Sequence, residues 1–177
     1  MRVSACGLVA KNIKEAKYIS KIVTEISHNH PEAIKAAEAI SVSIFMASHG
    51  YKMNDIKSYI MNNYYNINFT LDEIRDNYEF NITCQGSVPQ ALEAFFESKS
   101  FEDAIRNAIS IGGDSDTIAA ITGSIASAYY GVPNNLRKKA LSFFDGNLDN
   151  ELINIINDFE RKYPTKYENK FLKWLNN

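Results

Sequence analysis

Residues 101–133 read FEDAIRNAISIGGDSDTIAAITGSIASAYYGVP, and this stretch predicts two helices joined by a glycine loop. In its first part, apolar residues recur every three or four positions, which is the period of a helix with one buried face. Ser100 stands just before it, where an N-cap is expected. After Gly112-Gly113, a second helical pattern runs over residues 116–130 and ends at a Gly-Val-Pro stop. We therefore expect a helix, a tight loop and a second helix.

The second of these helices has an unusual composition. Ala119, Gly123 and Ser127 fall on one face, four residues apart, and further small residues fill the neighbouring row. Glycine inside a helix costs about 1 kcal/mol relative to alanine, a cost that is tolerated where another backbone must come close. We therefore expect this segment to be the central, buried helix of the protein.

The rest of the chain is helical in pattern as well. Three helices are expected over residues 13–26 behind an Asn12 cap, from Pro31 to before Gly50, and over 54–65. A capping box at Thr70–Glu73 predicts a short helix to about Phe80, and a second box at Ser87–Gln90 predicts another. Two more helices are expected over 134–144 and 149–162, with Asp145-Gly146 as the turn between them. A terminal apolar group follows at Phe171, Leu172, Trp174 and Leu175. Since no strand alternation or repeat is evident, we predict one all-α domain over residues 1–177, with about eight helices.

The composition excludes several classes of protein. The 177 residues are 45% hydrophobic and 23% charged, with a net charge of −2, which is ordinary for a globular domain. This balance argues against nucleic-acid binding through a basic face, and no apolar run approaches the roughly 20 residues of a membrane-spanning helix. Cys6 and Cys84 form no CxxC pair, so neither a disulfide scaffold nor a zinc site is expected. Because the first residues do not resemble a secretory signal, we expect a cytoplasmic protein.

The glycine loop also carries candidate ligands for a metal ion. Asp114, Asp116 and Thr117 offer two carboxylates and a hydroxyl within four residues, and such oxygen ligands suit Mg²⁺, which keeps several of its waters. Gly112 and Gly113 can adopt backbone angles closed to other residues and so turn both acids to one side. Two alternatives stay open. Acids at this position are also ordinary helix caps, and a glycine loop before a helix can hold phosphate, although the lysine of a P-loop is missing here.

Four stretches of the sequence, in the same order, resemble the ADP-ribosylglycohydrolase family. Residues 84–92, CQGSVPQAL, resemble that family's CQGTVPxAL, and residues 101–133 resemble its segment around GGDSDTxAAxxGxxAxAxxG. The opening MRVSACG is similar to MRVSPxG, with Ala5 where proline is usual. The stretch SHNHPEAIKAAEAI is similar to THxHPExxxGAxAx, with Ala36 where glycine is common. The resemblance covers about residues 1–135.

The resemblance implies an all-α orthogonal helical bundle around a two-magnesium site that cleaves the bond between ADP-ribose and a modified group. Asp114, Asp116 and Thr117 match the family's C-terminal metal ligands. The residues that we expect to lie beside the substrate are His28, Gly112, Gly113 and Ser115. An ADP-ribosylated protein, or ADP-ribose itself, is the implied partner, and no catalytic residue is assigned.

Members of this family have an upstream half of similar size, whose Thr-Asp-Asp-Thr motif supplies the other metal ligands. The present chain has no such motif, so the resemblance implies a C-terminal part with its N-terminal half missing and its two-metal site incomplete. We expect such a chain to be inactive alone, and to self-associate or bind an upstream fragment over the face of Ala119, Gly123 and Ser127. The alternative is a non-catalytic module that binds ADP-ribose, another nucleotide or a protein.

Overall fold

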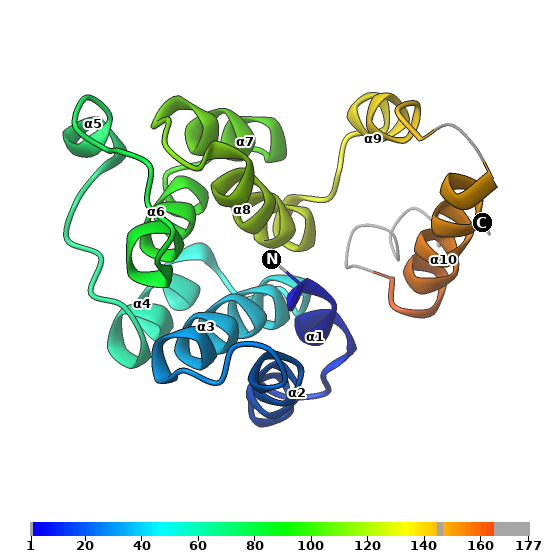
Figure 1. Ribbon diagram of the computed structural model, residues 1–177, viewed down its shortest axis with the longest axis horizontal. Helices are drawn as coiled ribbons and strands as arrows, with labels where there is room; N and C mark the ends of the chain where they lie inside the picture. Colours follow the sequence, from blue (N-terminus) through cyan, green and yellow to red (C-terminus); the bar gives the residue numbers. More distant parts are fainter. Residues whose placement is uncertain (1, 145–146, 165–177) are drawn as a thin grey trace.

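In the computed structural model, which describes residues 2–144 and 147–164, every regular element is a helix (Figure 1). The predicted all-α fold is therefore confirmed. The helices of the described residues are α1 (Ser4–Val9), α2 (Ile13–Glu25), α3 (Pro31–Ser48), α4 (Met53–Asn63), α5 (Leu71–Ile74), α6 (Cys84–Phe96), α7 (Phe101–Ser110), α8 (Ser115–Tyr130), α9 (Asn134–Leu141) and α10 (Asn147–Lys162). Within residues 2–144 and 147–164, no helix combines the length and apolarity that crossing a bilayer requires.

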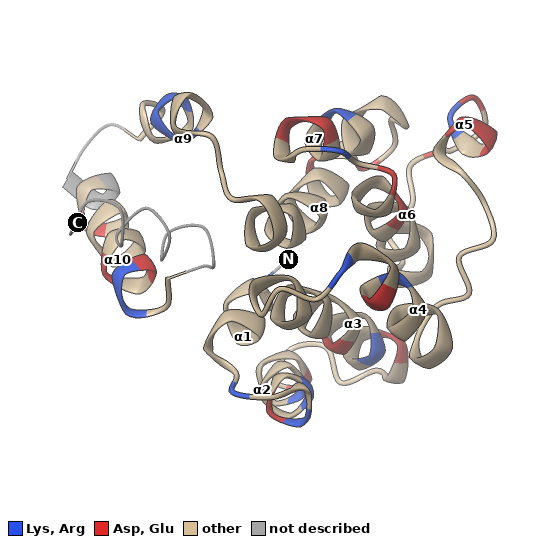
Figure 2. Cartoon of the chain, turned by 180° about the vertical axis from the view of Figure 1, so that it is seen from behind, with Lys and Arg blue, Asp and Glu red and all other residues tan. Residues whose placement is uncertain are grey.

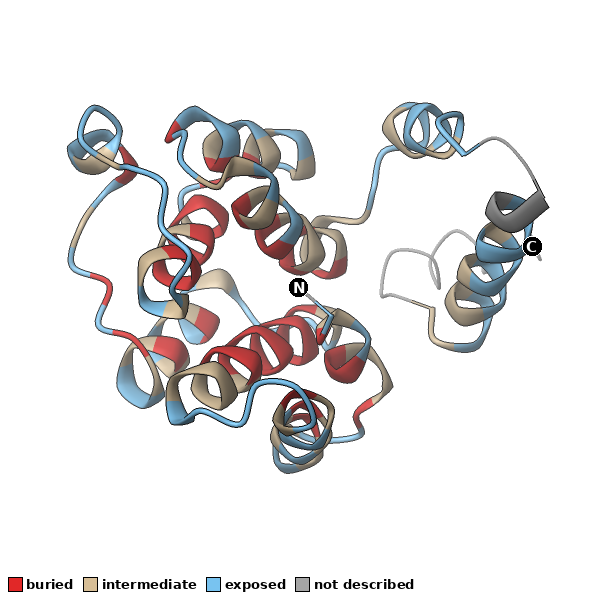
Figure 3. Cartoon of the chain, viewed as in Figure 1, coloured by how far each residue is buried: buried red, intermediate tan, exposed pale blue. Residues whose placement is uncertain are grey.

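Helix α3 is the most buried element. It is buried at almost every position from Ala36 to Ala47 (Figure 3), because α1, α2, α4, α6 and α8 all pack around it. Its polar side chains find partners inside the protein, as buried polar groups must. The Ser41 hydroxyl donates to the carbonyl of Ala16 on α2, at 3.2 Å. The hydrophobic core is therefore arranged around α3 rather than around the small-residue helix alone.

The small-residue helix α8 packs against α3, α6 and α7. Its fully buried side is apolar and branched, with Ile118 and Ile125 at 0% exposure. The row of Ala119, Gly123 and Ser127 is only half-buried. A methyl group at Gly123 would lie 2.9 Å from Cδ1 of Ile105 on α7. Helix α7 of this chain thus already covers part of the face over which we expected a partner to dock.

Several helix starts follow the capping residues that the sequence contains. The side chain of Asn12 accepts the Glu15 N–H, that of Ser100 accepts the Asp103 N–H, and Thr70 forms a full capping box with Glu73. These predictions are confirmed. Each cap satisfies an amide at the helix start that has no partner inside the helix.

Two predicted boundaries are wrong. Helix α5 ends at Ile74 instead of about Phe80, because the chain turns there so that the Tyr78 side chain can pack on other segments. Helix α6 begins at Cys84, where Thr83 is the cap, and not behind Ser87. The Ser87 hydroxyl instead donates to the carbonyl of Thr83, at 3.1 Å. Helix α1 had no counterpart in the sequence prediction.

An ion pair between α4 and α6 is the most buried one among the described residues. Lys57 Nζ lies 2.8 Å and 2.9 Å from the two carboxylate oxygens of Glu93. The Glu93 side chain is 4% exposed and that of Lys57 is 34% exposed. Burial raises the pKa of the Glu93 carboxyl, and the Lys57 ammonium opposes that rise. Elsewhere, basic and acidic positions are interspersed, as on α2 and α10 (Figure 2).

The last two helices stand apart from the others in Figure 1. Gly131, with φ of 77°, ends α8, and α9 and α10 follow close to the predicted positions. Arg137 on α9 forms a two-pronged ion pair with Glu160 on α10, at 2.9 Å and 2.7 Å. The predicted Asp145-Gly146 turn and the terminal apolar group after Pro164 lie outside the described residues.

A candidate substrate pocket at the start of helix α8

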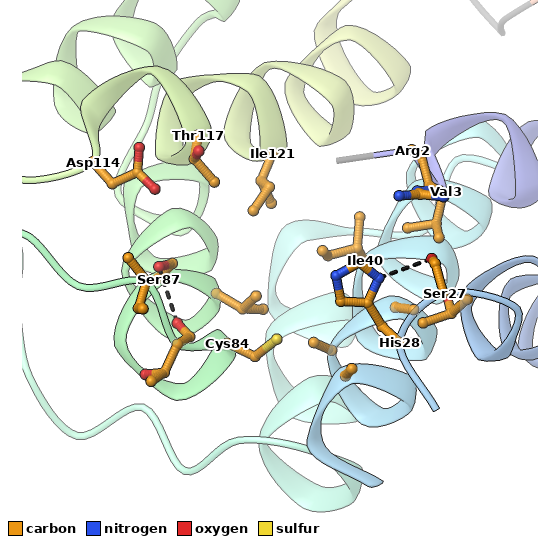
Figure 4. A pocket seen from close by; sticks show the side chains of 17 residues that line it. Arg2, Val3, Ser27, His28, Ile40, Cys84, Ser87, Asp114, Thr117 and Ile121 are labelled. Carbon is orange, nitrogen blue, oxygen red and sulfur yellow. Dashed lines mark hydrogen bonds between the residues drawn. The ribbon is translucent and has the colours of Figure 1, made fainter. Parts of the chain in front are cut away.

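A cavity of about 400 Å³ lies between α8, α6 and the facing ends of α2 and α3 (Figure 4). Its size is within the range of small-molecule sites. The cavity has an apolar floor and several polar side chains on its walls. Its lining residues are Ala33, Ala36, Ala37 and Ile40 of α3; Ile82, Thr83, Cys84, Ser87 and Val88 at the start of α6; Asp114, Thr117 and Ile121 on the α8 side; and Arg2, Val3, Thr24, Ser27 and His28.

The glycine loop creates the α8 side of the cavity. Gly112 and Gly113 have φ of 73° and 62°, values that favour glycine. The loop delivers Asp114 to the first position before α8, and its carboxylate and the Thr117 hydroxyl point toward the cavity in Figure 4. Within the described residues, the Asp114 side chain makes no capping hydrogen bond with α8. Asp114 thus occupies the N-cap position of α8 without forming a capping hydrogen bond to a described residue.

Asp116 is placed differently from its neighbours. It is exposed and does not line the cavity, contrary to our expectation that both acids face it. The pKa of Asp116 is lowered, first by a hydrogen bond with the Asp114 carboxyl group and then by the Thr117 N–H, at 2.9 Å. The two carboxyl groups thus adjoin one another at the edge of the cavity.

The side-chain oxygen atoms at the edge of the cavity are the kind of ligand that a hard cation prefers, but they are too few to complete its coordination. Asp114, Asp116 and Thr117 would offer Mg²⁺ two carboxylates and a hydroxyl, and water would fill its remaining positions. Across the part of the chain that the structure describes, no group of three or more His, Cys, Asp or Glu side chains could hold a metal ion. The described residues thus fit one side of a magnesium site.

The remaining predicted substrate residues separate into two groups. His28 lines the cavity on the side opposite Asp114, where its Nδ1 is 2.8 Å from the Ser27 hydroxyl oxygen (Figure 4). Gly112 and Gly113 in the loop, and Ser115 at the start of α8, do not line the cavity. Their placement supports the loop's shape rather than direct contact with a molecule in the cavity.

Most of the lining residues were not predicted from the sequence, and three of these are Arg2, Thr24 and Cys84. Arg2 brings a positive charge to the His28 side of the cavity (Figure 4). Thr24 is 8% exposed, and its hydroxyl oxygen is buried without a hydrogen-bond partner among residues 2–144 and 147–164. Such a group is costly unless something binds it. Cys84 is half-buried, and burial raises the pKa of its thiol, so the neutral form prevails at neutral pH.

Comparisons with known proteins show the family and the fold of the chain. The sequence profile of a family described as ADP-ribosylglycohydrolase matches residues 1–168. An uncharacterized protein of Archaeoglobus fulgidus is 27% identical over 144 residues, which are 72% of this chain and 47% of that protein. A solved structure described as an ADP-ribosylglycohydrolase-related protein complex is similar in fold, with a TM-score of 0.57 and 23% identity, over 73% of this chain and 49% of that one. The chain spans about half the length of these relatives.

Proposed function

Because the chain belongs to the ADP-ribosylglycohydrolase family, we propose that it forms the C-terminal portion of a magnesium-dependent hydrolase. This enzyme removes ADP-ribose from modified proteins or small molecules. The observation that carries the proposal is the cavity with two different polar sides, one with Asp114 and Thr117 and the other with Arg2 and His28.

The two sides suit the two kinds of polar group in ADP-ribose. Arg2 and His28 are donors that suit a diphosphate, since charge-assisted hydrogen bonds to phosphate are the strong ones. The Asp114 carboxylate and the Thr117 hydroxyl suit ribose hydroxyls. The buried Thr24 hydroxyl, which has no partner within the described chain, gains one when a ligand oxygen reaches it.

Magnesium, when bound, would polarise the ribose and a water molecule beside it. The residues of this chain that would hold the ion are Asp114, Asp116 and Thr117. Asp114 stands between the cavity and Asp116, so it can contact both the ion and the sugar. The alanine and isoleucine side chains of α3 make the floor of the cavity apolar, and low local polarity strengthens the polar contacts beside it.

The chain supplies only part of this machinery. It spans about half of its relatives, and its own oxygen ligands leave the cation largely hydrated. We therefore propose that hydrolysis requires a complementary segment with further carboxylates, and that this chain alone gives no detectable turnover.

The test is release of ADP-ribose from a modified protein. The chain is assayed alone and with a fragment that carries a Thr-Asp-Asp-Thr segment, in magnesium and in a chelator. Activity is expected only with both fragment and metal, and Asp114→Ala abolishes it. Asp55→Ala, which removes an exposed carboxylate of α4, is the matched control and keeps it. Metal-dependent turnover by the purified chain alone would falsify the incomplete-site argument.

A second candidate function is ADP-ribose binding without turnover. It is favoured by the fact that residues of this chain line the cavity, and that one of them, Thr24, has a buried hydroxyl without a partner in the described chain. In a chelator, a binding module retains most of its affinity for ADP-ribose, because Arg2, Thr24 and His28 need no metal. Calorimetry with and without magnesium separates this function from the first.

A further inference from the structure

Tyr78 connects three segments beside the pocket, although it does not line the cavity itself. It lies between α5 and α6, and its N–H donates to the Ile74 carbonyl at the end of α5, at 2.8 Å. Its hydroxyl donates to the carbonyl of Gly86 in the first turn of α6, at 2.6 Å. Its ring packs on Gly113, in the loop that precedes Asp114.

The contact with Gly113 is so close that a side chain at this position would have to displace the Tyr78 ring. A methyl group at Gly113 would lie 2.4 Å from Cε1 and 3.0 Å from Cδ1 of Tyr78, and 3.2 Å from the carbonyl oxygen of Glu79. Gly112 gives the contrast. It has a similar positive φ, yet a methyl group there would meet no other described atom within 4 Å. Only the second glycine of the loop is therefore held by a side chain.

From these contacts we propose that Tyr78 is a positioning residue: its ring holds the glycine loop in the conformation that directs Asp114 into the pocket. Two successive glycines have more backbone freedom than any other pair, and this freedom must be lost before a ligand or metal can be held. The ring against Gly113 removes part of it in advance. The hydroxyl bond to Gly86 fixes the ring to α6, which contributes Cys84, Ser87 and Val88 to the pocket lining.

The two contacts of Tyr78 can be separated by substitution. Tyr78→Phe keeps the ring on Gly113 and loses the hydrogen bond to Gly86, whereas Tyr78→Ala loses both. Phe80→Ala is the control, since Phe80 lies in the same segment and is 67% exposed. The consequence for ligand binding rests on the proposed function, but the consequence for the loop does not.

The first measurement concerns the loop itself. The chain has only eight glycines, so the amide signals of Gly112 and Gly113 can be followed by nuclear magnetic resonance. We expect Tyr78→Ala to shift and broaden both signals and to speed their hydrogen exchange, while Tyr78→Phe and Phe80→Ala leave them close to the wild type. Unchanged signals in Tyr78→Ala overturn the proposal, whether or not the protein binds ADP-ribose.

The second measurement is calorimetric titration of the full chain with ADP-ribose. We expect Tyr78→Ala to weaken binding by about tenfold and Tyr78→Phe by less than about threefold, because only the former frees the loop. If Tyr78→Ala fails to fold, Tyr78→Leu takes its place. Lack of binding by the wild-type chain would reject the proposed function, and the amide measurement would still decide the role of Tyr78.

A pair of glycine variants tests the contact directly. Gly112→Ala and Gly113→Ala carry a similar backbone strain, but only the second displaces the Tyr78 ring. We expect Gly113→Ala to disturb the Asp114 amide signal more than Gly112→Ala does, and this excess to disappear in the Tyr78→Ala background. Equal effects of the two glycine variants in both backgrounds would contradict the proposal.

Discussion

Replacement of Lys57 by methionine tests how the pocket-bearing helix α6 is anchored. Methionine keeps an apolar stem but removes the ammonium group, which leaves the Glu93 carboxylate, 4% exposed, without its cation. Loss of one partner from a fully buried pair costs about 3–5 kcal/mol. Because Lys57 is 34% exposed, solvent screening reduces this to roughly 2 kcal/mol. For a chain of this size, that loss lowers the unfolding midpoint by about 4–8 °C.

The same variant has a pH dependence whose direction follows from the Glu93 pKa. Burial raises the pKa of Glu93 in the folded protein above its ordinary value. The group therefore favours folding when it is protonated, and this contribution is lost as the pH rises through its folded pKa. Removal of Lys57 raises that pKa further. The cost of Lys57→Met is thus larger at about pH 8 than at about pH 5, because a larger fraction of the carboxyl is protonated at the lower pH and a protonated carboxyl needs no cation.

The assay is urea unfolding followed by circular dichroism at both pH values. Lys14→Met, which removes an exposed lysine of α2, is the matched control and should cost little at either pH. In a Glu93→Gln background, Lys57→Met should also cost little, because no buried charge is left unpaired. A cost below about 0.5 kcal/mol at about pH 8, or one that does not fall at about pH 5, would refute the reasoning.

Three further outcomes concern the pocket. Thr24→Val should stabilise the protein by about 1 kcal/mol in thermal unfolding, since it removes a buried hydroxyl without a partner in the described chain. The same variant should weaken ADP-ribose binding in calorimetry. Destabilisation together with unchanged affinity would contradict this. Burial raises the pKa of Cys84, so its alkylation by iodoacetamide, followed by mass spectrometry, should be slow at neutral pH, faster as the pH rises, and blocked by bound ADP-ribose. Asp114→Asn should weaken magnesium binding by the chain far more than Asp158→Asn on α10, and equal effects in calorimetry would place the ligands elsewhere.

The local features of the fold could be read from the sequence because they depend on neighbours in the chain. Asn12 and Ser100 cap helices as predicted, since a cap needs only its own side chain and an amide three residues later. Ser87 could not be assigned correctly in this way. Thr83 offers an equally good cap four residues earlier, and packing of α6 against α3 and α8 selects it.

The composition of the pocket could be predicted only in part. The family resemblance pointed to Asp114, Thr117 and His28, all of which line it. Arg2 and Thr24 come from distant segments that only the packing of α1 and α2 against α3 brings to the cavity. Which side of α8 Asp116 occupies depends on the helical phase set by the glycine loop, and no spacing rule supplies that phase.

The alanine-lined floor of the cavity is also the central helix of the hydrophobic core. Because α3 packs against α1, α2, α4, α6 and α8, movement of this floor would disturb most of the core. Any molecule that fills the cavity and binds only the folded protein increases the free energy of unfolding by mass action. The increase is about 2.7 kcal/mol at a ligand concentration one hundred times the dissociation constant, and it raises the unfolding temperature. The melting curve of the unlabelled protein thereby becomes a direct readout for ranking nucleotides and sugars against one another.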